Sequence, residues 1–184
     1  MRMQHCICLL AATFLAGCSA SPRQPGQRET LMLDVQMAIA DFKRADPTLQ
    51  SYFDRSAGYA VLPKVFKGAF LVGGAYGRGM VFERGGRFLG YCDMKQATLG
   101  FSFGGEYFRE IIFFRSPQDL RIFTQGNFTL SAQATATAVS VGAAAKADYQ
   151  DGMAVFVLAD TGLMVDVSIG GQRFEFEPAP RLMN

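Results

Sequence analysis

The sequence predicts an α+β fold, in which N-terminal helices pack on an antiparallel β-rich sandwich or barrel and one further helix is inserted between strands. Three observations lead to this fold class. Apolar residues recur every three or four positions near residue 30, they alternate with small residues beyond residue 57, and they make up 49% of the 184 residues. A chain of this length and composition can bury one substantial core. We expect a signal peptide at residues 1–17, a tether at 18–27 and a single domain at 28–184.

Residues 28–46 have the pattern of an amphipathic helix. Apolar residues such as Leu31, Val35 and Phe42 fall on one face, and charged residues lie between them. The Asp46-Pro47 dipeptide ends this helix and can begin a second short helix. We expect the apolar face of the first helix to pack on the core.

Strand patterns begin beyond Ala57, and the stretch FLVGGAYGRG, which starts at Phe70, is the clearest case. Bulky residues alternate there with glycine and alanine, as on the two faces of a strand. The alternative is a phosphate-binding loop, but such a loop needs a helix directly after its glycines. Here the alternation continues through MVFE, and Arg84-Gly85-Gly86-Arg87 fits a hairpin turn that leads back into FLGYC. We therefore interpret the stretch as a strand whose small face lets another layer or a ligand approach.

Further strands and one helix follow. The strand-like runs are TLGFSFG, GEYFREIIFF, NFTLSAQATATAV, MAVFVLA, LMVDVSI and QRFEFE. Between them, Ser116 precedes Pro117 in the manner of a helix cap. Leu120 and Phe123 are expected on the buried side of that helix.

The N-terminus has the features of a bacterial lipoprotein signal. Arg2 precedes an apolar run that is too short to span a membrane, and Leu15-Ala16-Gly17-Cys18 matches the lipobox. A lipobox implies cleavage before Cys18, attachment of a diacylglycerol to its thiol and usually acylation, for example by palmitate, of the new N-terminus. Ser19 favours the outer membrane, so we expect a lipid-anchored protein on its periplasmic side. The alternative is an ordinary secretory signal with a chance cysteine.

The predicted mature chain lacks the residues of several catalytic and metal sites. His5 is the only histidine, and it lies in the signal peptide, so histidine-dependent sites are excluded if cleavage occurs. Cys92 is the thiol that remains once Cys18 is lipidated, and its apolar neighbours suggest a buried small hydrophobe. We expect no enzymatic activity, no cofactor and no metal.

The acidic residues and the net charge suggest no further activity. Glu106 and Glu110 point the same way on a strand but lie about 13 Å apart by strand rise, too far for a glycosidase pair. Asp148 and Asp151 flank a predicted turn. A formal net charge of +2 gives no reason to expect a nucleic-acid partner.

The segment FDRSAGYAVLPKVFKGAFLVGGAYGRGMVF, which begins at Phe53, resembles the opening of the SYLF domain. Three later segments also agree with the family pattern: Thr98–Gly105, the helix at Gln118–Phe123, and Gly126–Leu130. The resemblance extends from about Leu31 to Glu177. Glu106 and Ser131 depart from it, because they stand where the family usually has glutamine and glycine.

SYLF domains are lipid-binding modules, associated in eukaryotes with phosphoinositides and, in yeast actin-patch proteins, with actin. Bacterial members are commonly predicted to be lipoproteins, and actin is not a plausible partner in a periplasm. The resemblance therefore implies that membrane phospholipid is the partner. An anionic headgroup requires cationic donors beside apolar surface. The candidate lipid-binding residues are Lys64, Lys67, Arg78, Arg84 and Arg87, each of which alone also fits an ordinary solvated charge.

The sequence leaves two functions open. The first is a lipid-binding module that recognises anionic phospholipid headgroups, with Tyr76 and Tyr107 at the membrane interface. The second is a structural or protein-interaction component of the cell envelope without a ligand of its own. The sequence identifies no particular protein partner.

Overall fold

The computed structural model describes residues 24–69, 72–99, 104–131, 134–160, 169 and 171–180. The predicted signal peptide and Cys18 lie outside these residues. The elements in chain order are α1 (Pro25–Ala45), the 3-10 helix η1 (Pro47–Leu49), α2 (Gln50–Arg55), β1 (Gly58–Ala69), β2 (Val72–Glu83), β3 (Phe88–Leu99), β4 (Gly104–Phe114), α3 (Pro117–Thr124), β5 (Asn127–Thr129), β6 (Thr137–Ala138), β7 (Met153–Ala159) and β8 (Arg173–Pro178). The predicted α+β class is confirmed.

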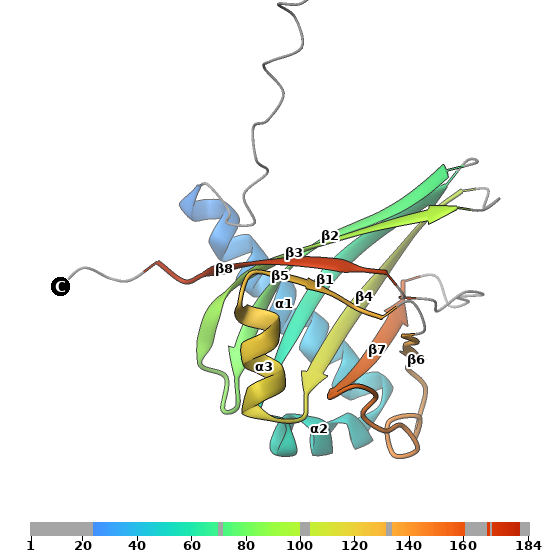
Figure 1. Cartoon of the computed structure of the whole chain (residues 1–184). Coiled ribbons are helices and arrows are strands. Elements are labelled where there is room, and N and C mark those ends of the chain that lie inside the picture. Colours follow the sequence, from blue (N-terminus) through green and yellow to red (C-terminus); the bar gives the residue numbers. More distant parts are fainter. Residues whose placement is uncertain are drawn as a thin grey trace, which may run out of the picture.

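The strands form one eight-stranded sheet in the order β5-β8-β3-β2-β1-β4-β7-β6. Neighbouring strands are antiparallel except for β6 and β7, which are parallel. The sheet curls into a half-barrel, and the long strands β1 to β4 extend beyond its body at one end (Figure 1). The predicted sandwich or barrel is thus a single curled sheet.

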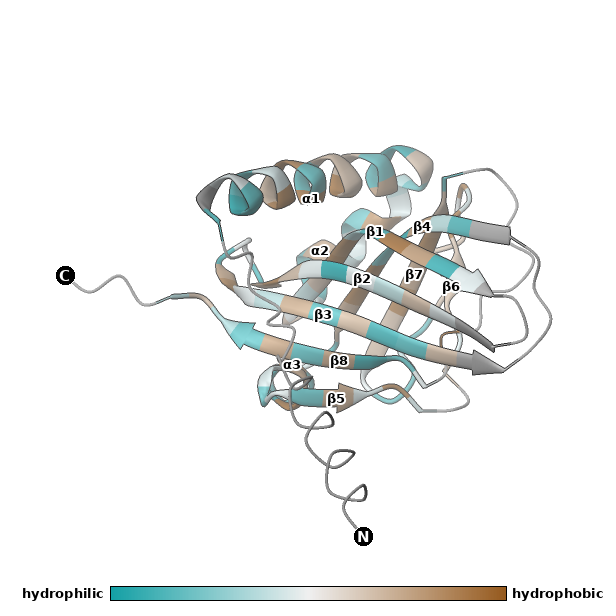
Figure 2. Ribbon diagram, turned by 90° about the horizontal axis from the view of Figure 1, so that it is seen from above, coloured by the Kyte–Doolittle hydropathy of each residue, from teal (hydrophilic) through white to brown (hydrophobic). Residues whose placement is uncertain are grey.

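The strands present apolar side chains on both faces of the sheet, and helices cover both faces. On the α1 face, α1, η1 and α2 pack over the strands, and Phe42 and Phe156 are fully buried. On the α3 face, α3 packs over the strands, and Phe123 and Phe174 are fully buried. Figure 2 shows α1 and α3 on opposite sides of the sheet. The alternating side chains of the central strands therefore supply two cores rather than one.

Hydrogen bonds of Asp46 connect the C-terminal end of α1 to the loop that contains Gly142 and Ala144. The Asp46 carboxylate is buried and accepts hydrogen bonds from the backbone N–H groups of Thr48 (3.0 Å), Gly142 (3.1 Å) and Ala144 (2.7 Å). A buried carboxylate is tolerated when backbone donors satisfy it in this way. The contact holds the α1 to η1 junction against the α1 face.

A β-bulge interrupts β1. Relative to both neighbouring strands, β1 carries one extra residue between Val61 and Val65. As a result Leu62 and Val65 both pack into the α3-face core, whereas Pro63 and Lys64 both border the α1 face. Proline lacks an N–H donor, and in a sheet interior it is tolerated at a bulge.

Some predicted elements differ from the structure. The run NFTLSAQATATAV is not one strand, because β5 covers only Asn127–Thr129 and β6 only Thr137–Ala138. Helix α1 begins at Pro25, inside the predicted 18–27 tether. In the run TLGFSFG, residues 98–99 end β3 and residue 104 begins β4, while residues 100–103 lie outside the described residues. Most of LMVDVSI lies outside the described residues. The helix at Ser116 is confirmed, since Ser116 and Asp119 form a reciprocal capping box.

The stretch FLVGGAYGRG is a strand from Val72 onward, and no helix follows it. Gly77 and Gly79 face the α3-face core. A Cβ atom at Gly77 would lie 2.7 Å from Cγ2 of Val65, and one at Gly79 would lie 2.3 Å from the Val61 carbonyl oxygen. These glycines are therefore required by the close approach of β1, which supports the strand interpretation.

Gly77→Val should lower the free energy of unfolding by about 1 to 3 kcal/mol, because the added side chain overpacks the contact with Val65. Urea unfolding measures this loss. Gly26→Ala is the control, since no atom lies within 4 Å of its added Cβ, and alanine should be neutral or stabilising in a helix. A Gly77→Val protein as stable as the wild type would contradict the packing described.

A buried polar pair crosses the α3 face. The Gln172 side-chain amide donates a 3.0 Å hydrogen bond to Oε2 of Glu110, and both side chains are fully buried. Among the described residues, Oε1 of each side chain has no hydrogen-bond partner. Burial raises the pKa of Glu110 to about 7, although the bond from Gln172 acts in the opposite direction.

The free energy of unfolding should fall as the pH rises from about 4.5 to about 7, because the folded protein binds the Glu110 proton more tightly than the unfolded chain does. Glu110→Gln should remove this dependence and stabilise the protein at pH 8 by on the order of 3 kcal/mol. Urea unfolding of both proteins at pH 5 and pH 8 measures the difference. An identical pH dependence in the two proteins would show that Glu110 is not its source.

Candidate functional site

Three aromatic side chains form an exposed row on the α1 face. Phe66 of β1 is paired with Tyr76 of β2 on one side and with Tyr107 of β4 on the other. Paired residues of adjacent strands lie on the same face, and the ring centroids of Phe66 and Tyr107 are 5.2 Å apart. Their exposed fractions are 44%, 43% and 43%. We call Phe66, Tyr76 and Tyr107 the aromatic row.

The aromatic row borders a groove between α1 and the sheet. A hollow of about 350 Å³ lies between Leu31 and Asp34 of α1 and the aromatic row. Two further hollows, of about 450 and 340 Å³, lie along α1. Asp34 borders all three. We call these three hollows the α1 groove.

Lys64 reaches the α1 groove because of the bulge in β1. Its ammonium nitrogen lies 4.5 Å from the centroid of the Tyr107 ring, and its side chain is exposed. A cation over an aromatic face is attracted by the ring quadrupole. The groove therefore presents a positive charge directly beside apolar surface.

Arg78 supplies a second cation, which is held by a buried acid. Its Nε donates to Oδ1 of Asp93 at 3.2 Å, and its Nη2 donates to the Tyr76 hydroxyl at 3.3 Å. The Asp93 side chain is fully buried, whereas that of Arg78 is 35% exposed. Burial raises the pKa of the Asp93 carboxyl, and the Arg78 guanidinium partly offsets this effect. Asp93 therefore orients Arg78 toward the groove and compensates its charge.

The five cations predicted to bind lipid do not form one surface. Lys64 and Arg78 meet at the α1 groove. Lys67 lies on the opposite face, since it alternates with Phe66 and is paired with the buried Ala75 of the α3-face core. The lipid-binding role of each stays a prediction.

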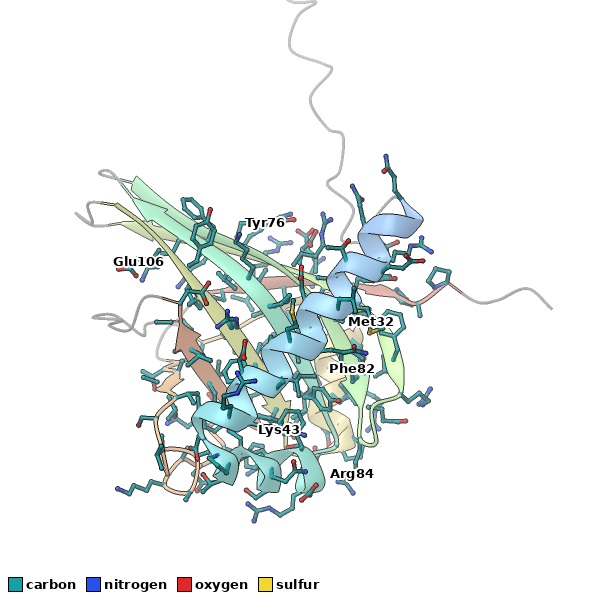
Figure 3. All side chains as sticks on the ribbon, turned by 180° about the vertical axis from the view of Figure 1, so that it is seen from behind. Met32, Lys43, Tyr76, Phe82, Arg84 and Glu106 are labelled. Atoms are coloured by element: carbon teal, nitrogen blue, oxygen red, sulfur yellow. The ribbon has the colours of Figure 1, made fainter. Side chains whose placement is uncertain are left out.

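Arg84 and Arg87 lie in the turn between β2 and β3, at the end of the sheet opposite the aromatic row. Figure 3 shows Arg84 and Tyr76 toward opposite ends of the molecule. Arg84 donates 2.7 Å hydrogen bonds to the carbonyl oxygens of Arg55 and Ser56, and Arg87 forms an ion pair with Glu83. These contacts secure the turn. Gly85 and Gly86 have positive φ angles there, as the predicted hairpin requires.

The other residues singled out in the sequence lie outside the groove, in the core, on the surface or in a turn. Cys92 is fully buried, and burial raises the pKa of its thiol, which agrees with the predicted small hydrophobe. Glu106 is exposed while Glu110 is buried. Asp151 adopts a positive φ of 50° in the predicted turn. Within the described ranges, no group of three or more His, Cys, Asp or Glu is placed to hold a metal ion.

Sequence reasoning missed three residues of the site, namely Phe66, Asp34 and Asp93. A signal for Phe66 was present, because it lies two positions after Lys64 in the same strand-like run. Asp34 had the pattern of a solvated helix residue. Asp93 carried no local signal, since its partner Arg78 lies in another strand.

Comparison with known proteins finds one family model and one relative that are similar to parts of this chain. Residues 95–178 match the family model Ysc84, described as "Las17-binding protein actin regulator". The chain is 25% identical over 128 residues to "Beta cell expansion factor A" of Aeromonas veronii, which covers 70% of this chain and 49% of that protein. The chain thus spans about half the length of this curated relative. No helix among the described residues is both long enough and apolar enough to cross a membrane. Together with the motif in its first strands, these matches support a SYLF domain in this chain.

Proposed function

We propose that this protein is a non-enzymatic lipoprotein of the bacterial cell envelope that binds phospholipid through the α1 groove. The observation that carries the proposal is the exposed aromatic row with Lys64 and Arg78 beside it. Similarity to the SYLF family supports a lipid-binding or actin-regulator-like domain. Of these two, the surface chemistry of the groove favours lipid.

The groove combines the two kinds of group that a bilayer surface attracts. Aromatic side chains with an apolar body and a polar tip are favourable at the level of the headgroups. Lysine and arginine beside them can contact the phosphate, each contributing about 1 kcal/mol near an anionic surface. In this proposal the aromatic row meets the interface, and Lys64 and Arg78 contact the headgroup phosphate.

A lipid anchor at Cys18 would hold the groove near the bilayer. Gln24, which borders the α1 groove, lies six positions after Cys18 in the sequence. A chain of six residues spans at most about 20 Å. In this proposal the protein lies on the periplasmic side of the outer membrane, and the short tether keeps the groove close to the membrane that carries the anchor.

The alternative is a structural or protein-interaction role in the envelope. It is favoured by Leu33 and Met37, which lie one turn apart on α1 and are each 59% exposed. Mild extraction followed by mass spectrometry separates the two roles. A copurifying phospholipid supports the first, while a recurrent partner protein without lipid supports the second.

Lys64→Gln should weaken binding to vesicles of phosphatidylethanolamine and phosphatidylglycerol about fivefold at low salt, since one lysine near such a surface contributes about 1 kcal/mol, and less at high salt. Sedimentation of residues 19–184, which include every described residue, measures the affinity. Lys67→Gln is the matched control on the opposite face and should bind like the wild type. Arg78 is a poorer test, because its removal would leave the buried Asp93 uncompensated. Equal losses from Lys64→Gln and Lys67→Gln would contradict the groove as the binding surface.

Cells that express the full chain should incorporate radiolabelled palmitate into the protein, and Cys18→Ser should abolish the labelling, because the acylated residue is then absent. Gel fluorography of the immunoprecipitated protein measures the incorporation. Undiminished labelling of Cys18→Ser would rule out the lipobox interpretation.

A further inference from the structure

In the hollow between α1 and the aromatic row, the charges are balanced rather than cationic. In the hollow of about 350 Å³, Lys64 and Arg78 approach from the sheet and Asp34 approaches from α1. The fourth charge, Asp93, lies fully buried beneath Arg78 and is paired with it. Two positive charges therefore face two negative ones. A purely anionic headgroup would gain from the cations but would be repelled by Asp34.

Asp34 is the groove acid that is available to a ligand. The other carboxylates at the groove have partners, because Asp41 and Asp160 both pair with Arg109 and Asp93 pairs with Arg78. Among the described residues, Asp34 forms no ion pair or hydrogen bond through its side chain. It is half-buried and borders every hollow of the groove. A carboxylate in this position is suited to accept charge-assisted hydrogen bonds from a bound cation.

The two kinds of charge lie on opposite walls of one hollow. The cations belong to β1 and β2, whereas Asp34 belongs to the helix that crosses them. A headgroup that fills the hollow can thus place a phosphate against the sheet and an ammonium group against α1. Phosphatidylethanolamine carries this pair of groups. Phosphatidylglycerol carries the phosphate and a neutral glycerol, and therefore has no ammonium group.

We propose that the α1 groove selects phospholipids whose headgroup carries a primary ammonium beside the phosphate, with Lys64 and Arg78 on the phosphate and Asp34 on the ammonium. The selection rests on the proposed function, since it assumes that the groove contacts lipid. A primary ammonium donates hydrogen bonds to Asp34, whereas the trimethylammonium of phosphatidylcholine has no N–H to donate. Lys64 already occupies a face of Tyr107, which leaves that ring face unavailable to a choline cation.

The test compares three kinds of vesicle by sedimentation at low salt, using residues 19–184. One is phosphatidylcholine alone, and the other two contain the same mole fraction of either phosphatidylethanolamine or phosphatidylglycerol. The vesicles with phosphatidylethanolamine should bind roughly tenfold more tightly than those with phosphatidylglycerol, the effect of one charge-assisted hydrogen bond. Tighter binding to phosphatidylglycerol, or equal binding to both, would overturn the proposed selectivity and leave lipid binding intact.

Asp34→Asn tests the residue itself, because it removes the acid from the groove. The variant should lose its preference for phosphatidylethanolamine and bind phosphatidylglycerol more tightly than the wild type does. Glu29→Gln is the matched control, since it removes one negative charge from the same helix at a position that borders none of the three hollows. It should leave the ratio of the two affinities unchanged. Comparing proteins on identical vesicles cancels differences in bilayer packing.

The outcomes separate the two proposals. A preference for phosphatidylethanolamine that disappears in Asp34→Asn and persists in Glu29→Gln supports the assigned contact. A preference that persists in a folded Asp34→Asn protein, as checked by circular dichroism, overturns it. Absence of binding to all three vesicles overturns the proposed function as well.

Discussion

The extra residue in β1 is the constraint on which the candidate site depends. Without the bulge, strict alternation would place Lys64 on the same face as Leu62, inside the α3-face core. The bulge instead turns Pro63 and Lys64 toward α1 and returns Val65 to the core. Phe66 then lies in register with Tyr76 and Tyr107. Bulges commonly re-aim side chains in this way near functional sites.

The second requirement is a helix that leaves part of the sheet uncovered. The buried Asp46 carboxylate binds three backbone N–H groups and holds the C-terminal end of α1 against the α1 face. Toward its other end, α1 borders the hollows of the groove, and the aromatic row remains about two-fifths exposed. The same helix therefore closes the core at one end and forms a wall of the groove at the other.

The segment that matches the family model and the residues that line the groove come largely from different parts of the chain. The matched residues 95–178 include Tyr107 and Arg109 of β4. Lys64, Arg78 and Asp34 lie before residue 95. The residues to which we assign headgroup selection therefore lie outside the matched segment, so the proposed selectivity concerns this chain's own groove and not the family as a whole.

The sequence alone was sufficient for features that depend on local pattern. Helical periodicity predicted α1, the Ser116 cap predicted α3, and the alternation around Gly77 excluded a phosphate-binding loop. The paired glycines predicted the β2 to β3 hairpin, and apolar neighbours predicted the burial of Cys92. Each of these depends on interactions between residues close in the chain or on burial of a single apolar position.

Only the tertiary structure decided which charges meet. Five cations that seem to form one cluster in the sequence divide among the groove, the opposite face and the far turn. A one-residue bulge reverses the facing of every position after it, and its location depends on pairing with two other strands. The approach of Asp34 to the groove and the pairing of Arg78 with Asp93 likewise join residues from different elements. The sequence therefore determined the elements, whereas long-range pairing determined the charge of the site, because electrostatic balance depends on distances that no local pattern contains.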